Sequence, residues 1–437
     1  MTIAAGPIPG ISTHQMLVFL LQIGVLLAVA TVLGRVAVRL RLPPVVGELT
    51  AGVVLGPSLL GSAAPEVSHW LLPRDPAQMN LLAAVAQLGA LLLVAITGAH
   101  VDLGLLRRKR RTIGLVSTGS VLLPLGIGFA LGFLLPGSLI GAAVGRPTFA
   151  LFIGVAVAVS ALPVIAKTLL DMGLLHRDVG QLIVGSAAVS DIVGWLLLSI
   201  VSATVTHGLR LSVVAEGVGY LLVALAVAAL ASRLLARRVL RSADPSGQQG
   251  LSLPVVVGSV VLSAAGTQAL GLEPIIGAFL CGIVVGSVGS ASRRSLDSMR
   301  AFVMAVLAPL FLASAGLQVN LAALRHPQVL IATLVTLAVA IGAKFAGGYL
   351  GARAGRLDHR ESLAVGAGLN ARGVVEIVLA STGLRLGVLT DTSYSIIVLV
   401  AVVTSVMAAP ILRRTTERIA TTGAEVQREQ EFAAQLV

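Results

Sequence analysis

The sequence contains few charged residues, few aromatic residues and almost no cysteine. Charged side chains make up 11% of the 437 residues, against roughly 25% in soluble domains, which excludes a cytosolic enzyme with a water-facing surface. Aromatic residues make up 3%, too few to form a platform on which nucleic-acid bases stack. The single cysteine, Cys281, excludes a disulfide framework and a multi-cysteine metal site. The seven histidines are scattered, and none are spaced as a helical zinc site requires.

Long apolar segments fill most of the chain. Hydrophobic residues make up 56% of it, and the mean hydropathy is +0.98. A membrane-spanning helix needs about 20 mostly apolar residues. The alternative, a set of buried core helices, leaves no room for a soluble domain around them. We therefore predict an all-α polytopic membrane protein with about thirteen spans, at residues 14–38, 43–62, 80–101, 112–136, 147–170, 178–203, 211–232, 250–270, 274–290, 299–317, 327–352, 361–384 and 392–412.

The basic residues cluster in alternate loops between these spans. The chain carries 31 Lys and Arg against 19 Asp and Glu, and most of the basic residues lie in the same alternate set of loops, for example Arg35–Arg41, Arg107–Arg111, Lys167 with Arg177, Arg233–Arg241, Arg293–Arg300, Arg353–Arg360 and Arg413–Arg428. Such loops face the cytoplasm, so the net charge of +12 requires no nucleic-acid partner. We expect an inner-membrane protein with its N-terminus outside and its C-terminus in the cytoplasm. Residues 1–414 form the predicted membrane domain, and 415–437 a short cytoplasmic tail with no regulatory domain.

Four ionisable residues lie inside predicted spans, where charge is expensive and marks ion pathways. These residues are Asp191, Lys344, Arg372 and Glu376, and Glu48, near the start of the second span, is a weaker case. The Asp191 carboxylate, among small neighbours, can hold a proton or an alkali cation but hardly both, which is the minimum chemistry of a cation/proton exchanger. The alternatives are a structural Asp191–Lys344 bridge and a Lys344 side chain that snorkels to the membrane surface.

Two predicted spans contain helix breakers at mid-depth. Pro163 lies in the segment 158–164, and Gly368 and Gly373 flank Asn370 and Arg372 in the segment 366–376. Paired interrupted helices in the two halves of a chain indicate the midplane site of a transporter. Ser160 and Asn370 add the oxygen ligands that alkali cations prefer. The alternative is a pair of ordinary kinks, because Gly and Pro are common in membrane helices.

Five segments in order resemble motifs of the monovalent cation:proton antiporter-2 family, which includes the Kef-type systems and the plant cation/proton exchangers. The resemblance covers residues 14–412 and rests on Leu42–Ser58, on Ser160-Ala-Leu-Pro-Val164, on Asp178–Trp195, on Gly277-Ala-Phe-Leu-Cys-Gly282 and on Asn370-Ala-Arg-Gly-Val-Val-Glu376. It implies an inverted-repeat sodium/proton-antiporter fold and a homodimer. The fifth and twelfth spans would then be crossing broken helices, and Asp191 the essential ion- and proton-binding residue.

Two positions depart from the family pattern. Ser190 stands where relatives often have Asp, Asn or Gln, which makes electrogenic two-proton exchange doubtful. His100, in Gly98-Ala-His-Val-Asp102, replaces a common Glu and raises the hypothesis of a pH sensor. A lone histidine is more often merely interfacial.

The predicted function is exchange of Na⁺ or K⁺ for H⁺ without a cofactor. Asp191 would bind the proton or the alkali cation, and Ser160, Ser190 and Asn370 would supply or orient polar ligands. Lys344, Arg372 and Glu376 would balance charge around the crossing. Two alternatives stay open: a channel-like cation efflux protein, and a protein of the same fold that serves as a sensor or partner subunit. An enzyme is the least favoured class, because the spans show no nucleophile–base pair.

Overall fold

A computed structural model describes residues 12–40, 42–73, 75–207, 249–269, 274–286, 299–317, 326–417 and 419–433, with the isolated positions 219, 226, 230 and 234. These residues are almost entirely helical. Strand pairing within the described ranges is limited to an isolated antiparallel bridge between Ile140 and Leu389. The all-α fold predicted from the sequence is therefore confirmed.

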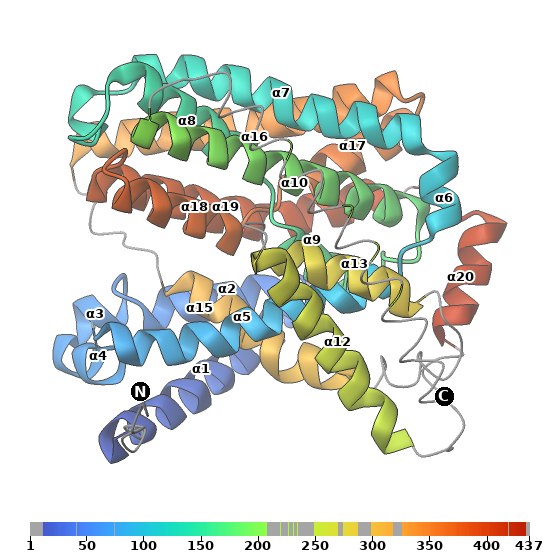
Figure 1. Cartoon of the computed structure of the whole chain (residues 1–437), viewed down its shortest axis with the longest axis horizontal. Helices are drawn as coiled ribbons and strands as arrows, with labels where there is room; N and C mark the ends of the chain where they lie inside the picture. The colour runs from blue at the N-terminus through green and yellow to red at the C-terminus, as the bar shows by residue number, and fades with distance from the viewer. Residues whose placement is uncertain are drawn as a thin grey trace, which may run out of the picture.

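The helices form two bundles, which appear as a lower and an upper group in Figure 1. The first bundle contains α1 (Thr13–Arg39), α2 (Pro44–Leu55), α5 (Pro76–Ala99), α12 (Gln249–Ala269), α13 (Pro274–Gly286), the π-helical turn η2 (Val303–Leu307) and α15 (Ala308–Gly316). The second contains α7 (Arg110–Leu134), α8 (Arg146–Ala158), α9 (Leu162–Asp171), α10 (Asp178–His207), α16 (Pro327–Ala354), α17 (His359–Gly368), α18 (Val374–Arg385) and α19 (Asp391–Thr416).

Short helices mark the two ends of the bundles. The helices α3 (Leu60–Ala63), α4 (Pro65–Leu71) and η1 (Gly137–Leu139) lie at one end. The helix α6 (Leu103–Arg108), which begins the basic run Arg107–Arg111, lies at the other end with α20 (Gly423–Ala433), as Figure 1 shows. The expected cytoplasmic loop and the C-terminal tail thus share one end.

The helices match the predicted spans wherever the structure describes the chain. Eight of them are long and apolar enough to cross a membrane, and the segments 253–269 and 274–286 are shorter apolar helices. The predicted span 211–232 lies outside the described residues apart from three isolated positions, as do Arg233–Arg241 and Arg293–Arg294. A multi-pass membrane protein is confirmed, and the number thirteen stays a prediction.

Polar side chains cap several of the helices where they begin. Ser12 and Asp358 form capping boxes at the starts of α1 and α17, with Gln15 and Glu361 as their partners. Such caps satisfy backbone N–H groups that have no partner within the helix. At Asp358, hydrogen bonds from the following backbone N–H groups hold the pKa of the carboxyl below its ordinary value.

Glycines bring helices into backbone contact inside each bundle. A Cβ atom added at Gly52 of α2 would lie 1.9 Å from the carbonyl oxygen of Ala313 in α15. Gly119 of α7 and Gly347 of α16 meet in the same way in the second bundle. Such close approach is the usual source of affinity between membrane helices, because lipid gives them no hydrophobic drive to associate.

We expect Gly52→Ala to destabilise the first bundle, because the new methyl group meets the backbone of α15 and not a movable side chain. Overpacking of this kind costs about 1–3 kcal/mol, so the midpoint of thermal unfolding in detergent should fall. The matched control is Gly126→Ala in α7, where an added Cβ meets nothing within 4 Å. The control should keep or raise the midpoint, since Ala favours helix by about 1 kcal/mol. Equal midpoints for the two variants would contradict the close contact.

Candidate ion-binding site

Two interrupted helices cross in the middle of the second bundle. The first pair is α8 and α9, separated by residues 159–161, and the second is α17 and α18, separated by residues 369–373. The backbone N–H of Ala161 donates to the carbonyl of Ala371 at 3.3 Å. The Ser160 hydroxyl donates to the carbonyl of Leu369 at 3.5 Å. The two interruptions therefore touch, and the crossing expected from the resemblance is present.

The breaker residues lie at the edges of these interruptions. Pro163 sits in the first turn of α9 and not in the gap, and its missing N–H costs nothing there. Gly368 is the last residue of α17, and Gly373 immediately precedes α18. A Cβ at Gly373 would lie 2.5 Å from a methyl group of Val164 in α9. Gly373 thus allows the start of α18 to lie directly against α9.

Asp191 lies at the N-terminal end of a half-helix. It belongs to α10, is 5% exposed, and its Oδ2 accepts a hydrogen bond from the backbone N–H of Leu162 at 3.1 Å. Leu162 is the first residue of α9. The N-terminus of a helix carries a partial positive charge and unpaired N–H groups. The half-helix therefore favours the negative charge of this carboxylate.

Lys344 lies at the opposite kind of helix end. It belongs to α16, is 0% exposed, and donates to the carbonyl of Ser120 at 3.0 Å and to the carbonyl of Ala158. Ala158 is the last residue of α8, so the ammonium group meets the partial negative charge of a helix C-terminus. Complete burial contradicts the alternative in which Lys344 snorkels to the membrane surface.

Arg372 binds the same end of α8 from the second interruption. Its guanidinium donates to the carbonyls of Ala156 at 3.2 Å and Val157 at 2.6 Å, and to Ala340 of α16 at 3.0 Å. It also forms an ion pair with Glu376 at 3.2 Å, and both side chains are buried. Glu376 lies in the first turn of α18, where a negative charge is favoured. Each of the four predicted intramembrane charges thus lies at an end of a half-helix.

The predicted polar ligands Ser190 and Asn370 differ in the hydrogen bonds that they form. The Ser190 hydroxyl donates to the carbonyl of Ser186 at 2.8 Å and lies 3.2 Å from the Ser120 hydroxyl of α7. Asn370 uses its amide N–H to bind the carbonyl of Ile341 at 3.1 Å. Its buried Oδ1 has no hydrogen-bond partner among the described residues, which leaves this oxygen for an ion. Ser190 instead links α10 to α7.

Two serines that form hydrogen bonds at the site were not predicted from the sequence. Ser120 supports Lys344 and contacts Ser190, and Ser405 of α19 donates to the carbonyl of Arg372. Serine is common in membrane helices, so nothing in the sequence singled these two out.

His100 lies at the end of α5, and its Nδ1 is 2.7 Å from the carbonyl of Ile96 one turn earlier. The pH-sensing hypothesis for His100 stays a prediction.

A cavity of about 600 Å³ opens where α9 ends, on the side of the bundles where α20 docks. We call it the vestibule. It lies between the two bundles and is lined by Val38, Leu42, Pro43, Pro44, Asp171, Met172, Leu174, Arg177, Arg413, Thr416, Glu417, Ile419 and Thr421. Lys167, assigned to a loop from the sequence, lies instead in α9 and is 2% exposed. That assignment was wrong because α9 continues to Asp171 before it ends.

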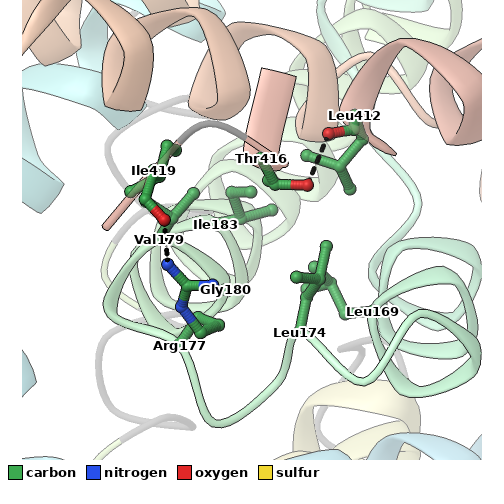
Figure 2. A pocket seen from close by; sticks show the side chains of 9 residues that line it. All are labelled: Leu169, Leu174, Arg177, Val179, Gly180, Ile183, Leu412, Thr416 and Ile419. Atoms are coloured by element: carbon green, nitrogen blue, oxygen red, sulfur yellow. Dashed lines mark hydrogen bonds between the residues drawn. The ribbon is translucent and has the colours of Figure 1, made fainter. Parts of the chain in front are cut away.

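The segment after α19 closes one side of the vestibule. Figure 2 shows a small adjoining pocket, in which the Arg177 guanidinium binds the carbonyl of Ile419 at 2.9 Å. The tail helix α20 then docks through Glu425, which pairs with Arg177 at 3.2 Å and accepts the Asp178 N–H at 2.7 Å. Arg428 adds a bond to the carbonyl of His176 at 2.6 Å. The tail is therefore attached to the start of α10, the helix that carries Asp191.

Apolar helices that enclose two crossed, interrupted helices and a buried carboxylate define a secondary ion transporter. Residues 24–418 match the family described as sodium/hydrogen exchanger, transmembrane, and the chain belongs to this family. This membership confirms the antiporter resemblance and the expectation of a transporter and not an enzyme.

Named relatives and a solved structure agree with this assignment. The Na⁺/H⁺ antiporter NhaS4 of Synechocystis is 29% identical over 92% of this chain and 97% of its own. Cation/H⁺ antiporter 17 of Arabidopsis thaliana is 28% identical over 91% of this chain, which spans about half of the plant protein (48%). The structure of the sodium proton antiporter MjNhaP1 from Methanocaldococcus jannaschii matches with a TM-score of 0.67 at 16% identity. That match covers 92% of this chain and 99% of the other, and it confirms the fold.

We expect Arg372→Met to destabilise the crossing, because it leaves Glu376 buried without its ion-pair partner. Removal of one partner of a buried pair costs about 3–5 kcal/mol, so thermal unfolding in detergent should begin at a lower temperature. Addition of Glu376→Gln to Arg372→Met should recover part of the loss, since it removes the uncompensated charge. A double variant no more stable than Arg372→Met would show that the two side chains are not coupled.

Docking of the tail should depend on Glu425 and should fail only in acid. Burial alone would raise its pKa, but backbone N–H bonds and Arg177 hold the pKa of Glu425 below the ordinary 4.5. The contribution of a carboxylate with a lowered pKa is present above the ordinary value and is lost as the pH falls through the lower, folded value. The protection factors of the amides in residues 423–433, which compare their exchange rates with those of an unfolded chain at the same pH, should therefore be high and constant at neutral pH and fall in acid.

In the same hydrogen-exchange measurement, Glu425→Gln should accelerate exchange already at neutral pH. The matched control is Glu429→Gln, whose exposed carboxylate lies 3.9 Å from His176. This control should leave exchange unchanged, because burial lowers the pKa of His176 and keeps the ring neutral. Equal effects of the two substitutions would contradict docking through Glu425.

Proposed function

We propose that this protein is a secondary active antiporter that exchanges a monovalent cation, Na⁺ or K⁺, for a proton by alternating access. The observation that carries the proposal is the position of Asp191, a buried carboxylate bound to the first N–H of α9 where two interrupted helices cross. Family membership and the antiporter names of the relatives support the same activity.

The charges around the crossing explain why the two ions compete. Asp191 and Glu376 carry two negative charges, and Lys344 and Arg372 carry two positive charges, so the unloaded site is neutral. A proton or a monovalent cation on Asp191 adds the same single charge. The loaded states are therefore electrostatically alike, and one carboxylate cannot hold both ions. Because Ser190 supplies no second carboxylate beside Asp191, this site exchanges one proton for one cation.

The surrounding oxygens suit an alkali cation. The free Oδ1 of Asn370 and the hydroxyl of Ser160 lie in the two interruptions, next to backbone carbonyls that the half-helices leave without helical partners. Half-helix ends of this kind bind ions in other transporters. Lys344 and Arg372 already occupy the carbonyls of α8. An incoming cation is therefore directed to Asp191 and the second interruption.

The membrane arrangement follows the basic loops. We propose an inner-membrane homodimer in which residues 1–414 form the transport domain, and 415–437 form a cytoplasmic tail. Support comes from α6 and α20, which share one end of the bundles (Figure 1), together with the excess of Lys and Arg expected in cytoplasmic loops. The vestibule then opens to the cytoplasm, and the N-terminus lies outside.

We expect Asp191→Asn to abolish exchange while the protein still folds and inserts, because Asn keeps the shape of the side chain but holds neither ion. The measurement is cation-induced collapse of a pH gradient in proteoliposomes, with Na⁺, K⁺, Li⁺ and choline. The wild-type KM for the cation should also rise as the pH falls, because protons compete for the same carboxylate.

The matched control is Asp391→Asn, an exposed carboxylate in the first turn of α19, which should exchange like the wild type. Cation-driven proton movement that survives Asp191→Asn would overturn the one-carboxylate mechanism. Cation flux far above exchanger rates without fixed proton coupling would favour the channel-like alternative. Absence of any flux in the wild type would favour a sensor or partner subunit.

A further inference from the structure

A second group of buried charges joins the two bundles below the crossing. The Lys167 ammonium of α9 lies 2.6 Å and 2.8 Å from the two oxygens of Asp171, one turn further along the same helix. It also lies 3.3 Å from Oε1 of Glu48 in α2. Asp171 in turn accepts a hydrogen bond from the backbone N–H of Val45 near the start of α2. We call Glu48, Lys167 and Asp171 the interface cluster.

The interface cluster is separate from the proposed transport site. Asp191 binds Leu162 at the first residue of α9, and Asp171 is the last residue of that helix. With a rise of about 1.5 Å per residue, the two ends of α9 lie about 14 Å apart. Glu48 also belongs to the first bundle, which supplies none of the charges at the crossing. The exchange mechanism does not use these three residues.

The interface cluster lacks one positive charge. Among the described residues, the ion-pair partner within 4 Å of these two carboxylates is the Lys167 ammonium group. Its three protons are matched by three oxygens at hydrogen-bond distance, two on Asp171 and one on Glu48. Glu48 is only 6% exposed. Its second carboxylate oxygen is buried and has no hydrogen-bond partner within the described part of the chain. An uncompensated buried charge is costly, so Glu48 requires a further positive charge, either a proton on its carboxylate or a bound cation.

The further positive charge has a route from water and a defined magnitude. Asp171 lines the vestibule of about 600 Å³, so a hydrated ion can reach the interface cluster. A single positive charge neutralises it, whereas a divalent ion would leave one positive charge in excess. Carboxylate oxygens are hard ligands suited to hard cations. A proton and a monovalent alkali cation both meet these requirements, and a measurement of bound Na⁺ tells the two apart.

We propose that Glu48 and Asp171 form a second monovalent-cation site at the inner wall of the vestibule, with Lys167 as its fixed positive partner. The inference rests on the proposed antiport function for the identity of the ion. The site holds the cation before it moves to Asp191. Because Glu48 lies in α2 whereas Lys167 and Asp171 lie in α9, a bound cation also favours the arrangement in which the two bundles meet here.

The test counts bound cations in the full-length chain with Asp191→Asn as the background. Binding of ²²Na⁺ to the purified protein, at constant ionic strength made up with choline, should show one saturable site per chain in this background. Addition of Glu48→Gln should abolish that site or weaken it more than tenfold. If the Glu48→Gln chain does not fold, Asp171→Asn in the same background removes the other carboxylate and should give the same loss.

Thermal unfolding separates this proposal from a purely structural ion pair. Glu48→Gln should raise the unfolding midpoint in choline, because it removes the uncompensated charge and leaves Lys167 paired with Asp171. In the Asp191→Asn background, it should also remove the further rise caused by Na⁺. A structural ion pair predicts a lower midpoint and unchanged cation binding. The control Glu417→Gln alters an exposed carboxylate that also lines the vestibule and should change neither measurement.

Two outcomes would overturn the second site. One is a folded Asp191→Asn protein that binds no Na⁺, and the other is unchanged binding after both Glu48→Gln and Asp171→Asn. Neither outcome depends on transport. Exchange that survives Asp191→Asn would instead overturn the proposed function while the count of bound ions still stands.

Discussion

The rest of this structure depends on one constraint: the backbone carbonyl and N–H groups left unpaired between α8 and α9 must find hydrogen-bond partners. A helix interrupted inside a membrane exposes backbone groups that lipid cannot satisfy, at several kcal/mol each. Here charged side chains satisfy them. Arg372 and Lys344 bind the last carbonyls of α8, and Asp191 binds the first N–H of α9. The same charges that make the interruption stable also surround the proposed ion-binding site.

This arrangement explains why so few charges can sustain exchange in so apolar a chain. Each charge lies at a helix end of opposite polarity, which lowers the free-energy cost of burying that charge before any ion binds. Lys344 and Arg372 are fixed on carbonyls, and Glu376 is fixed on Arg372. Asp191 accepts a hydrogen bond from the first backbone N–H of α9. In the proposed exchange it is the member of the group that trades a proton for a cation.

The long apolar segments predicted an all-α membrane fold, and the family resemblance implied the crossing of two broken helices. The intramembrane charges could be identified because Asp191, Lys344, Arg372 and Glu376 stand out against apolar neighbours. It could not predict their partners. Lys344 binds Ser120, which is 224 residues away in the sequence, and distant pairings of this kind leave no local pattern. Lys167 was misplaced for a related reason. A lysine near the end of an apolar run is typical of a loop, and only Glu48, 119 residues away, accounts for its burial in α9.

The helix α9 is held by charge at both ends but by different bundles. Its first residue bonds Asp191 of the second bundle, whereas Lys167 and Asp171 near its last turn contact α2 of the first. Within each bundle, glycines such as Gly52 and Gly119 bring backbones together and resist sliding. Between the bundles, α9 meets α2 partly through the ion pair of Lys167 with Glu48, whose geometry can change without repacking a core. In the proposed alternating access, the boundary between the bundles is therefore where movement is expected, and α9 links this boundary to Asp191.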